Sequence, residues 1–453
     1  MYEATLIAGR IVTPDDHDYD EARRAWNLAV DQRPAAVGLP ESAEDVMAVV
    51  RMARERGWRV APQGTGHNAA PLAEGLDNTV LVRTERMRGV IVDPVGRRAR
   101  VQAGATWGDV IAAVSEHGLT ALSGSSHDVG VVGYLLGGGM SWMARKYGLG
   151  VNHIHAIEIV TADGHLVRAD ADHEPDLFWA VRGGSGNFGV VTAVEIGLFD
   201  VQTAYAGMLV WPAAQAADVL KAWVRWTETA PEEITTAARL LNVPPIPEIP
   251  EPFRGRSLVV IDGAYTGDEA GAIEALRPLR ELGPEIDTFA TIPTAALIQI
   301  HMDPPEPVPA IGDGGMLGGL DDAAIDAVLE VAGPQTRSPL MMVEFRHAGG
   351  AAGRAPAGHG ATGALDGSYV LFGGGMPLTP EIGQAVVAHL AAVKDALGPW
   401  VAGREYWNFI ERTVADASGF FEPAVYARLQ QVKAAYDADD VFRGNHPIPP
   451  AGA

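Results

Sequence analysis

The sequence predicts an α+β protein made of two lobes. Its 453 residues exceed the roughly 250–300 residues at which a single hydrophobic core stops growing, so we expect two cores. Residues 35–200 alternate short β-rich runs with amphipathic helices. Beyond residue 200, amphipathic helices alternate with strand-like runs, which fits helices covering one face of an antiparallel sheet.

In the first lobe, the clearest helices are predicted over residues 43–55 and 107–117, where apolar side chains recur at helical spacing. Runs of Val, Leu and Ile at 80–82 and 90–92 indicate strands. Glycine is densest from residue 124 to 150 and again from 183 to 189. In these stretches we expect the backbone to approach a ligand closely.

The second lobe is predicted from four amphipathic helices and three strand-like runs. The helices are expected over residues 213–229, 268–282, 321–332 and 380–397. The strands are expected over residues 258–262, 340–345 and 369–372. Proline-rich stretches at 243–253 and 302–309 indicate long surface loops.

Composition excludes several classes of function. A formal net charge of −23 disfavours nucleic acid and anionic membranes as partners, because binding phosphates depends on Lys and Arg. No run of about 18 apolar residues could span a bilayer, and the first ten residues lack the pattern of a secretory signal, so we expect a cytoplasmic protein. The chain has no cysteine, and its histidines lack metal-ligand spacing, so redox chemistry must come from a bound organic cofactor.

Two glycine-rich segments carry the strongest functional signal. The first, residues 62–68, reads PQGTGHN and presents His67 after a glycine-paced turn. The second, residues 124–139, reads GSSHDVGVVGYLLGGG. Glycine lets main-chain N–H groups approach oxygen atoms closely and adopt positive φ, as a pyrophosphate cradle requires. Together the two segments predict a backbone laid against a flat ligand that bears phosphate.

Both segments resemble the flavin-binding loops of FAD-linked oxidases of the berberine bridge enzyme-like group, within the vanillyl-alcohol oxidase superfamily. The likeness continues in residues 33–57, and it covers nearly the whole chain. Residues 406–409 (YWNF) and 436–446 (YDADDVFRGNH) resemble the family's Tyr-x-Asn-Tyr and Tyr-Asp-Pro-x-Asn-Val-Phe-Arg-x-Asn-Gln patterns. The departures from these two patterns are Phe409, Ala438, Asp440 and His446.

The resemblance implies a PCMH-type FAD-binding domain over residues 1–200, an inserted substrate domain over 201–400, and a C-terminal segment, 401–453, that returns to the FAD-binding domain. It implies FAD as cofactor, attached covalently through His67. Ser126 stands where many members have a second linking cysteine, so the link should be single. The predicted cofactor-binding residues are Gln63, Gly64, Thr65, Gly66, His67, Asn68, Gly124, Ser125, Ser126, Asp128, Val129, Gly130, Gly133, Tyr134, Gly137, Gly138, Gly189, Val190, Val191 and Asn445.

The resemblance also implies an oxidase that moves hydride from an alcohol, amine or activated C–H of a small molecule to flavin N5, with O2 reoxidising the flavin to give H2O2. If residues 406–409 are extended, Tyr406 and Asn408 share one face and Phe409 points the other way. Tyr406 is then the predicted proton acceptor, once a neighbour lowers the pKa of its phenol from about 10. Arg354, in a segment that resembles one of the family's substrate sheet, is the predicted cation, and an exposed loop position is its alternative.

Other interpretations stay open. The string GSGNFG at residues 184–189 matches the G-x-G-x-x-G pattern of dinucleotide folds. It follows a predicted helix and precedes a predicted strand, the reverse of that motif's context, so NAD binding is a minor alternative. A flavin-dependent oxygenase or oxidative cyclase, or a flavin-binding protein without turnover, would use the same loops. No motif defines the substrate or the oligomeric state.

Overall fold

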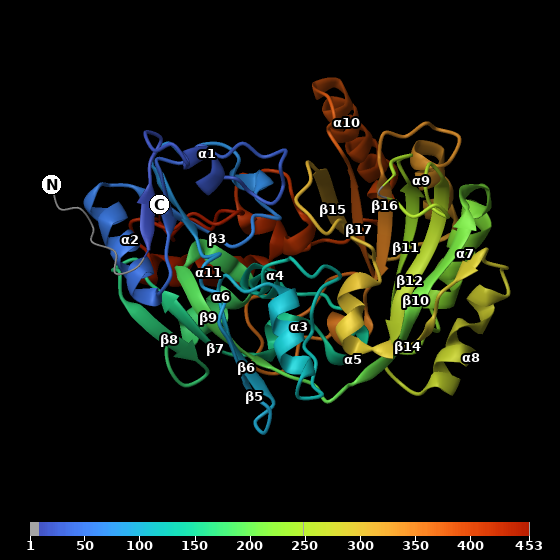
Figure 1. Ribbon diagram of the computed structural model, residues 1–453, viewed down its shortest axis with the longest axis horizontal. Coiled ribbons are helices and arrows are strands. Elements are labelled where there is room, and N and C mark those ends of the chain that lie inside the picture. The colour runs from blue at the N-terminus through green and yellow to red at the C-terminus, as the bar shows by residue number, and fades with distance from the viewer. Residues whose placement is uncertain (1–8, 248, 453) are drawn as a thin grey trace.

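The computed structural model describes residues 9–247 and 249–452, and it has two halves that lie side by side (Figure 1). Two sheets build one half and a single large sheet builds the other. Residues 1–8, on which the expectation about a secretory signal depends, lie outside the described residues. No helix in the described ranges is long and apolar enough to cross a membrane.

The first half begins with a four-stranded sheet in the order β1-β2-β4-β3. Strand β1 pairs antiparallel with β2, and β2, β4 and β3 run parallel. Helix α2 packs on this sheet and begins as the sequence predicts, because the Ser42 side chain accepts a hydrogen bond from the backbone N–H of Asp45. The bounds are β1 Arg10–Val12, α1 Tyr19–Ala22, β2 Ala36–Leu39, α2 Ala43–Glu55, β3 Arg59–Gln63 and β4 Thr79–Arg83.

A five-stranded antiparallel sheet, in the order β5-β6-β9-β7-β8, completes the first half. Helix α6 precedes and β9 follows residues 184–189, the order that the sequence predicts and the reverse of a dinucleotide-binding turn. The bounds are β5 Val90–Asp93, β6 Arg98–Gln102, α3 Trp107–Ser115, α4 Val131–Leu136, α5 Ala144–Tyr147, β7 Ile154–Val160, β8 Leu166–Asp170, α6 Pro175–Gly184 and β9 Val190–Gly197.

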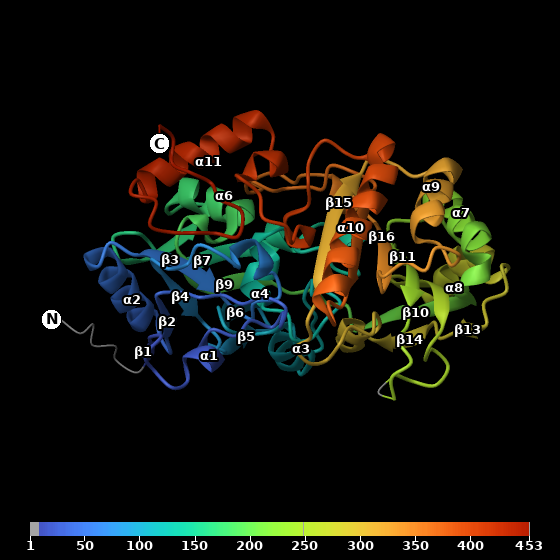
Figure 2. The ribbon, with the colours of Figure 1, turned by 90° about the horizontal axis from the view of Figure 1, so that it is seen from above.

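The second half is an eight-stranded antiparallel sheet with helices on one face, as predicted (Figures 1 and 2). The strand order is β13-β10-β12-β11-β16-β17-β15, and β14 pairs with β10. The strands are β10 Thr203–Pro212, β11 Ile234–Asn242, β12 Ser257–Tyr265, β13 Ile286–Asp287, β14 Ala290–Pro293, β15 Ile311–Leu317, β16 Met342–His347 and β17 Tyr369–Gly375. The helices are α7 Ala216–Thr227, α8 Glu269–Arg280, α9 Asp322–Ala332 and α10 Pro380–Ala396.

The two faces of this sheet differ in chemistry. Because side chains alternate along a strand, Ala238, Leu240 and Phe345 lie on one face and pack with the helices. The opposite face carries charge. Arg239 of β11 is paired with Glu344 of β16, and Arg346 follows Glu344 two residues later on the same face. Asp262 of β12 lies on the same face. This charged face is the one that meets the first half.

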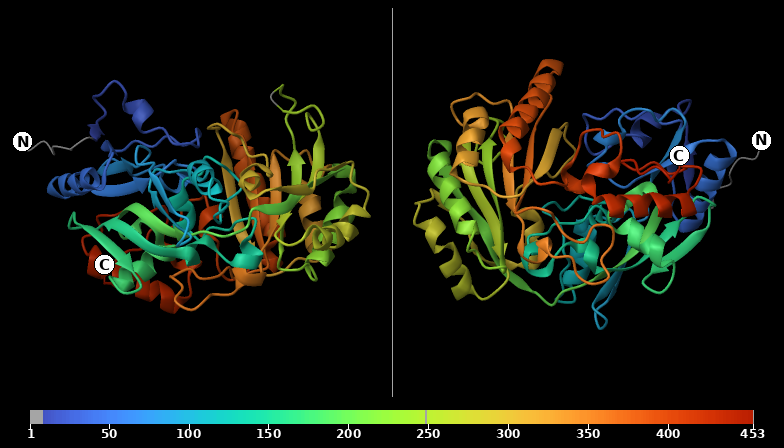
Figure 3. Two further views of the ribbon diagram at one scale, coloured as in Figure 1. Left: turned by 60° about the horizontal axis from the view of Figure 1, so that its bottom comes forward. Right: turned by 180° about the vertical axis from the view of Figure 1, so that it is seen from behind.

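The C-terminal segment crosses back to the first half. Residue Phe442 forms a parallel bridge with Val60 of β3, and the backbone N–H of Arg443 donates to the Val60 carbonyl at 2.9 Å. Helix α11, Pro423–Tyr436, packs against α6 (Figures 2 and 3). The segment therefore lies beside the strand that ends in the first glycine loop.

Candidate active site

The first glycine loop follows directly from β3 and places His67 among three side chains. The His67 ring stacks on Trp26 with centroids 4.1 Å apart. Its Nε2 atom lies 3.4 Å from Oδ1 of Asp128, and its Nδ1 atom lies 2.7 Å from the Thr65 hydroxyl. The side-chain amide of Asn445 donates to the backbone oxygen of Asn68, so the C-terminal signature reaches the same loop.

The second glycine segment lies against the first. A Cβ at Gly130 would stand only 3.6 Å from the Thr65 side chain. The segment is held in place by α3, since the backbone N–H of Trp107 donates to the Val129 carbonyl at 3.0 Å. The Ser126 hydroxyl donates to Asp128 at 2.8 Å, and the Ser125 hydroxyl donates to Asp303 at 2.8 Å. The tertiary structure thus brings together two loops that are sixty residues apart in the chain.

The triple glycine meets the C-terminal YWNF segment. The hydroxyl of Tyr406 accepts hydrogen bonds from the Met140 backbone N–H at 3.0 Å and from the Asn408 amide at 3.1 Å. Gly138 is left-handed, with φ of 126°, and a Cβ there would lie 2.9 Å from the Tyr406 ring. Only glycine therefore allows the tyrosine to approach this closely.

Two expectations about this segment are wrong. Trp407–Phe409 forms a short 3-10 helix rather than continuing an extended strand, so Phe409 turns inward and its ring lies 5.3 Å from that of Tyr406. Burial raises the pKa of Tyr406 to about 12, and this outweighs the Met140 and Asn408 hydrogen bonds and the charge of Arg346, which all lower it. The phenol is therefore protonated at neutral pH.

The predicted role of Arg354 is also corrected. Its side chain is 61% exposed, and the guanidinium pairs with Glu232 at 2.7 Å on the surface. The cation beside Tyr406 is Arg346, whose guanidinium carbon lies 4.9 Å from the centre of the Phe409 ring. The two arginines are eight residues apart, and only Arg346 lies in the sheet, where the strand carries its side chain inward.

Arg346 belongs to a cluster of six charged side chains, four of which are buried. Arg346 donates to Glu344 at 2.5 Å, Glu344 contacts His301 at 3.3 Å, and His301 pairs with Asp303 at 2.6 Å. Arg239 and Asp262 complete the cluster with a 2.6 Å ion pair. A cavity of about 10 Å³ is lined by Arg346, Ser125 and Met140, among others. The cluster thus joins the charged face of the sheet to the second glycine segment.

Protonation of His301 balances the charge of this cluster. Burial and Arg239 oppose its charge, but Asp303, Glu344 and Asp262 together raise its pKa to about 9. With His301 protonated, three cations face three carboxylates, and without that proton the cluster carries one uncompensated negative charge. A buried cluster of this kind is stable only when its charges are paired.

We expect the stability of the protein to fall as the pH rises from about 6.5 to 9. A pKa that is raised on folding stabilises the folded state fully below the unfolded value, and this stabilisation is lost as pH rises through the folded value. The difference between 6.5 and about 9 corresponds to roughly 3 kcal/mol. The melting temperature of wild-type protein should therefore drop more across this range than that of His301→Gln, and equal drops would remove His301 as the cause.

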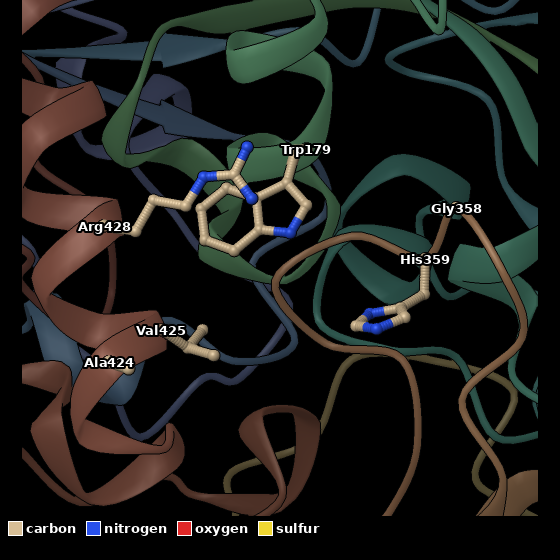
Figure 4. Close-up of a pocket in the computed structure, with 6 residues that line it drawn as sticks. All are labelled: Trp179, Gly358, His359, Ala424, Val425 and Arg428. Carbon is tan, nitrogen blue, oxygen red and sulfur yellow. The ribbon is translucent and has the colours of Figure 1, made fainter.

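A larger hollow lies elsewhere on the surface. It has a volume of about 390 Å³ and lies between α6, α11 and the loop at residues 358–359 (Figure 4). The Arg428 guanidinium covers the Trp179 ring at 3.8 Å and also pairs with Asp176. None of its lining residues belongs to the glycine segments or to the charged cluster, so this hollow is separate from the candidate site.

The sequence comparisons agree with this geometry. Residues 34–170 match the family described as FAD binding domain, and residues 406–449 match the family described as berberine and berberine like. The chain thus carries the FAD-binding domain and the C-terminal segment that characterise berberine bridge enzyme-like FAD-linked oxidoreductases. These matches contain both glycine segments and the YWNF segment.

Two relatives and one solved structure are similar to this oxidoreductase. It is 28% identical over 476 residues to (R)-6-hydroxynicotine oxidase of Paenarthrobacter nicotinovorans, covering 99% of this chain and 98% of that protein. It is 33% identical over 227 residues to glucooligosaccharide oxidase of Sarocladium strictum, covering 49% of this chain and 45% of that protein. The crystal structure of 6-hydroxy-D-nicotine oxidase from Arthrobacter nicotinovorans has the same fold, with a TM-score of 0.84 and 23% identity over 98% of each chain.

The residues of the first loop fit FAD. Gln63 Nε2 and Asn68 Oδ1 are buried and have no hydrogen-bond partner among the residues that the structure describes. Buried polar atoms are normally paired, so two orphans in one loop indicate the place of a ligand. Gly133 is exposed in α4, and a Cβ there would have nothing within 4 Å, which leaves room for a group against this helix.

For three residues predicted to contact the cofactor, packing within the first half already explains the residue type. Val190 and Val191 pair with β7 and are buried in the cores of the first half. A Cβ at Gly189 would lie 2.6 Å from the Val160 carbonyl, so close packing of β7 and β9 explains that glycine. None of these contacts involves a glycine segment.

Three ionisable residues near the site were not among those predicted from the sequence. Glu344 and Arg346 stand two residues apart in a strand-like run, and this spacing alone could have indicated a charged face. Glu411 has no such signal. Burial, followed by repulsion from Asp313, raises its pKa to about 7, and it lies two residues after Phe409.

Proposed function

We propose that this FAD-linked oxidoreductase is an oxidase, which takes hydride from an alcohol, amine or activated C–H of a small organic substrate and passes the electrons to O2 to give H2O2. Bound FAD supplies the chemistry by accepting hydride at N5. Two relatives, whose names describe oxidation of a hydroxynicotine and of an oligosaccharide, support the amine and the alcohol as substrate classes. The proposal includes a single covalent link between His67 and the flavin.

The observation that carries the proposal is the environment of the Tyr406 oxygen. Two N–H donors point at it, and Arg346 lies nearby. Donors and positive charge held in a dry site stabilise negative charge on oxygen. Tyr406 in its phenolate form would take the proton that leaves the substrate's oxygen or nitrogen, and Asn408 would hold it in place.

Arg346 takes the part that the sequence suggested for Arg354. It lowers the pKa of Tyr406, although burial keeps that pKa high. Glu344 anchors the guanidinium on one side. This leaves the guanidinium at the small cavity beside Met140 and Trp142.

The reaction class is tested by mixing the protein with a panel of alcohols and amines without oxygen. A substrate should bleach the flavin absorption, and readmitted O2 should restore it with one H2O2 released per turnover. Incorporation of label from ¹⁸O₂ into the product would show an oxygenase instead. Failure of every donor to bleach the flavin would favour a flavin-binding protein without turnover.

We expect the flavin to stay with the polypeptide after acid precipitation, because a bond to the His67 ring survives unfolding. His67→Ala should release all of its flavin under the same treatment while still binding FAD in its native state. The measurement is the flavin absorption of pellet and supernatant, with the intact mass of the chain as a second readout.

Flavin in the supernatant of wild-type protein would contradict the link itself. Flavin retained in the pellet by His67→Ala would assign the link to another residue. With no cysteine in the chain, a second link through a cysteine is excluded.

A further inference from the structure

The His67 side chain is held on three sides before any flavin is considered. The Trp26 ring covers it with an interplanar angle of 17°. The Thr65 hydroxyl contacts Nδ1, and the Asp128 carboxylate stands opposite Nε2. The ring therefore has one preferred orientation, and its two nitrogens have different partners.

Asp128 is itself fixed by two donors. The Trp26 indole N–H donates to Oδ2 at 2.5 Å, and the Ser126 hydroxyl donates to Oδ1 at 2.8 Å. Burial would raise the pKa of Asp128, but its contact with His67 and these hydrogen bonds lower it. The same indole thus stacks on the histidine and anchors the carboxylate that faces it.

We propose that Asp128 is the positioning residue for covalent attachment of the flavin, because its carboxylate holds the His67 proton on Nε2 and accepts that proton when Nδ1 forms the bond. This inference rests on the proposed link through His67. Nε2 is buried and has no hydrogen-bond partner within the described parts of the chain. Oδ1 of Asp128, 3.4 Å away, is an acceptor within reach.

The geometry determines which nitrogen reacts. A neutral imidazole carries its proton on one nitrogen and a lone pair on the other, and a neighbouring acceptor selects the protonated one. With the proton held at Nε2 by Asp128, the lone pair is on Nδ1, where the Thr65 hydroxyl can donate to it until the bond forms. A nucleophile beside a group that accepts its proton is the arrangement found in nucleophilic catalysis.

The step balances with O2 as the oxidant. The bond formed joins His67 Nδ1 to the carbon of the flavin 8-methyl group, and the bonds broken are one methyl C–H and the His67 Nε2–H. The Nε2 proton goes to Asp128 and the methyl proton to solvent. The electron pair passes to the flavin ring and then to O2, which with two protons becomes H2O2.

The test compares wild type with Asp128→Asn, in which the amide keeps the size of the side chain but cannot accept a proton. Each protein is purified with its flavin, total FAD per chain is measured by absorption, and the linked fraction is followed over time by intact mass. We expect wild type to be linked throughout, and Asp128→Asn to hold FAD but to link about 10²-fold more slowly, the range for losing a group that takes a proton. Asp128→Glu, which restores the carboxylate, should recover much of the rate.

The outcomes separate this inference from the proposed link. Linkage in Asp128→Asn as fast as in wild type overturns the role of Asp128 and leaves the link intact, whereas unlinked wild-type protein overturns the link. Trp26→Phe keeps the ring over His67 but removes the donor to Asp128, and it should link several-fold more slowly. Linkage at the wild-type rate in Trp26→Phe also contradicts the inference, even if Asp128→Asn cannot be purified.

Discussion

Replacing Tyr406 by phenylalanine is expected to slow reduction of the flavin by about 10²-fold or more, the range typical for losing a general base, with FAD content unchanged. The change removes the one oxygen at which the Met140 N–H and the Asn408 amide converge. It leaves the ring and its packing against the triple glycine in place. Rapid mixing with substrate in the absence of oxygen measures the effect directly.

The pH dependence sharpens this prediction. With a pKa of about 12, only a small fraction of Tyr406 is phenolate at neutral pH, and this fraction rises about tenfold with each pH unit. The wild-type reduction rate should therefore climb from pH 7 to pH 10, and the Tyr406→Phe rate should stay flat. Tyr426→Phe is the matched control, because burial also raises the pKa of Tyr426 to about 12 but this residue lies on α11. An undiminished rate in Tyr406→Phe would eliminate this residue as the base.

Replacing Arg346 by glutamine should have two large effects that a second substitution separates. Loss of the guanidinium leaves Glu344 as a buried charge with fewer partners, which costs about 3–5 kcal/mol of stability in comparable cases. It also removes the positive charge that lowers the pKa of Tyr406, so the reduction rate should fall and its rise with pH should move to higher pH. The measurements are the melting temperature and the reduction rate across pH.

The double variant Arg346→Gln/Glu344→Gln removes both charges of the pair. We expect it to recover much of the stability but none of the rate, because the phenolate still lacks its cation. Arg354→Ala is the control for a surface arginine, and exposed ion pairs such as its pair with Glu232 contribute about 0–1 kcal/mol. A pH profile that moves in Arg354→Ala and stays fixed in the double variant would return the role to Arg354.

Local sequence patterns predicted several helices and strands correctly. The helix predicted over residues 43–55 is α2, because Ser42 caps it and its apolar residues recur at helical spacing. The order of α6 and β9 around residues 184–189 was likewise predictable, since a local pattern indicates each element. The loop that presents His67 and the YWNF segment were both recognisable as motifs because their chemistry depends on short, contiguous spacing.

What the sequence alone determined is therefore the fold class and the resemblance to the family, while the flavin contacts of the two glycine segments stay predictions. The tertiary structure decided which charges meet the tyrosine. Arg346 rather than Arg354 faces Tyr406 because strand alternation turns it onto the charged face, while Arg354 lies in an exposed loop. It also decided the direction of the Tyr406 pKa, since burial is produced by packing of distant segments. The Trp26–His67–Asp128 contact joins three separate parts of the chain, so no local pattern could have predicted it.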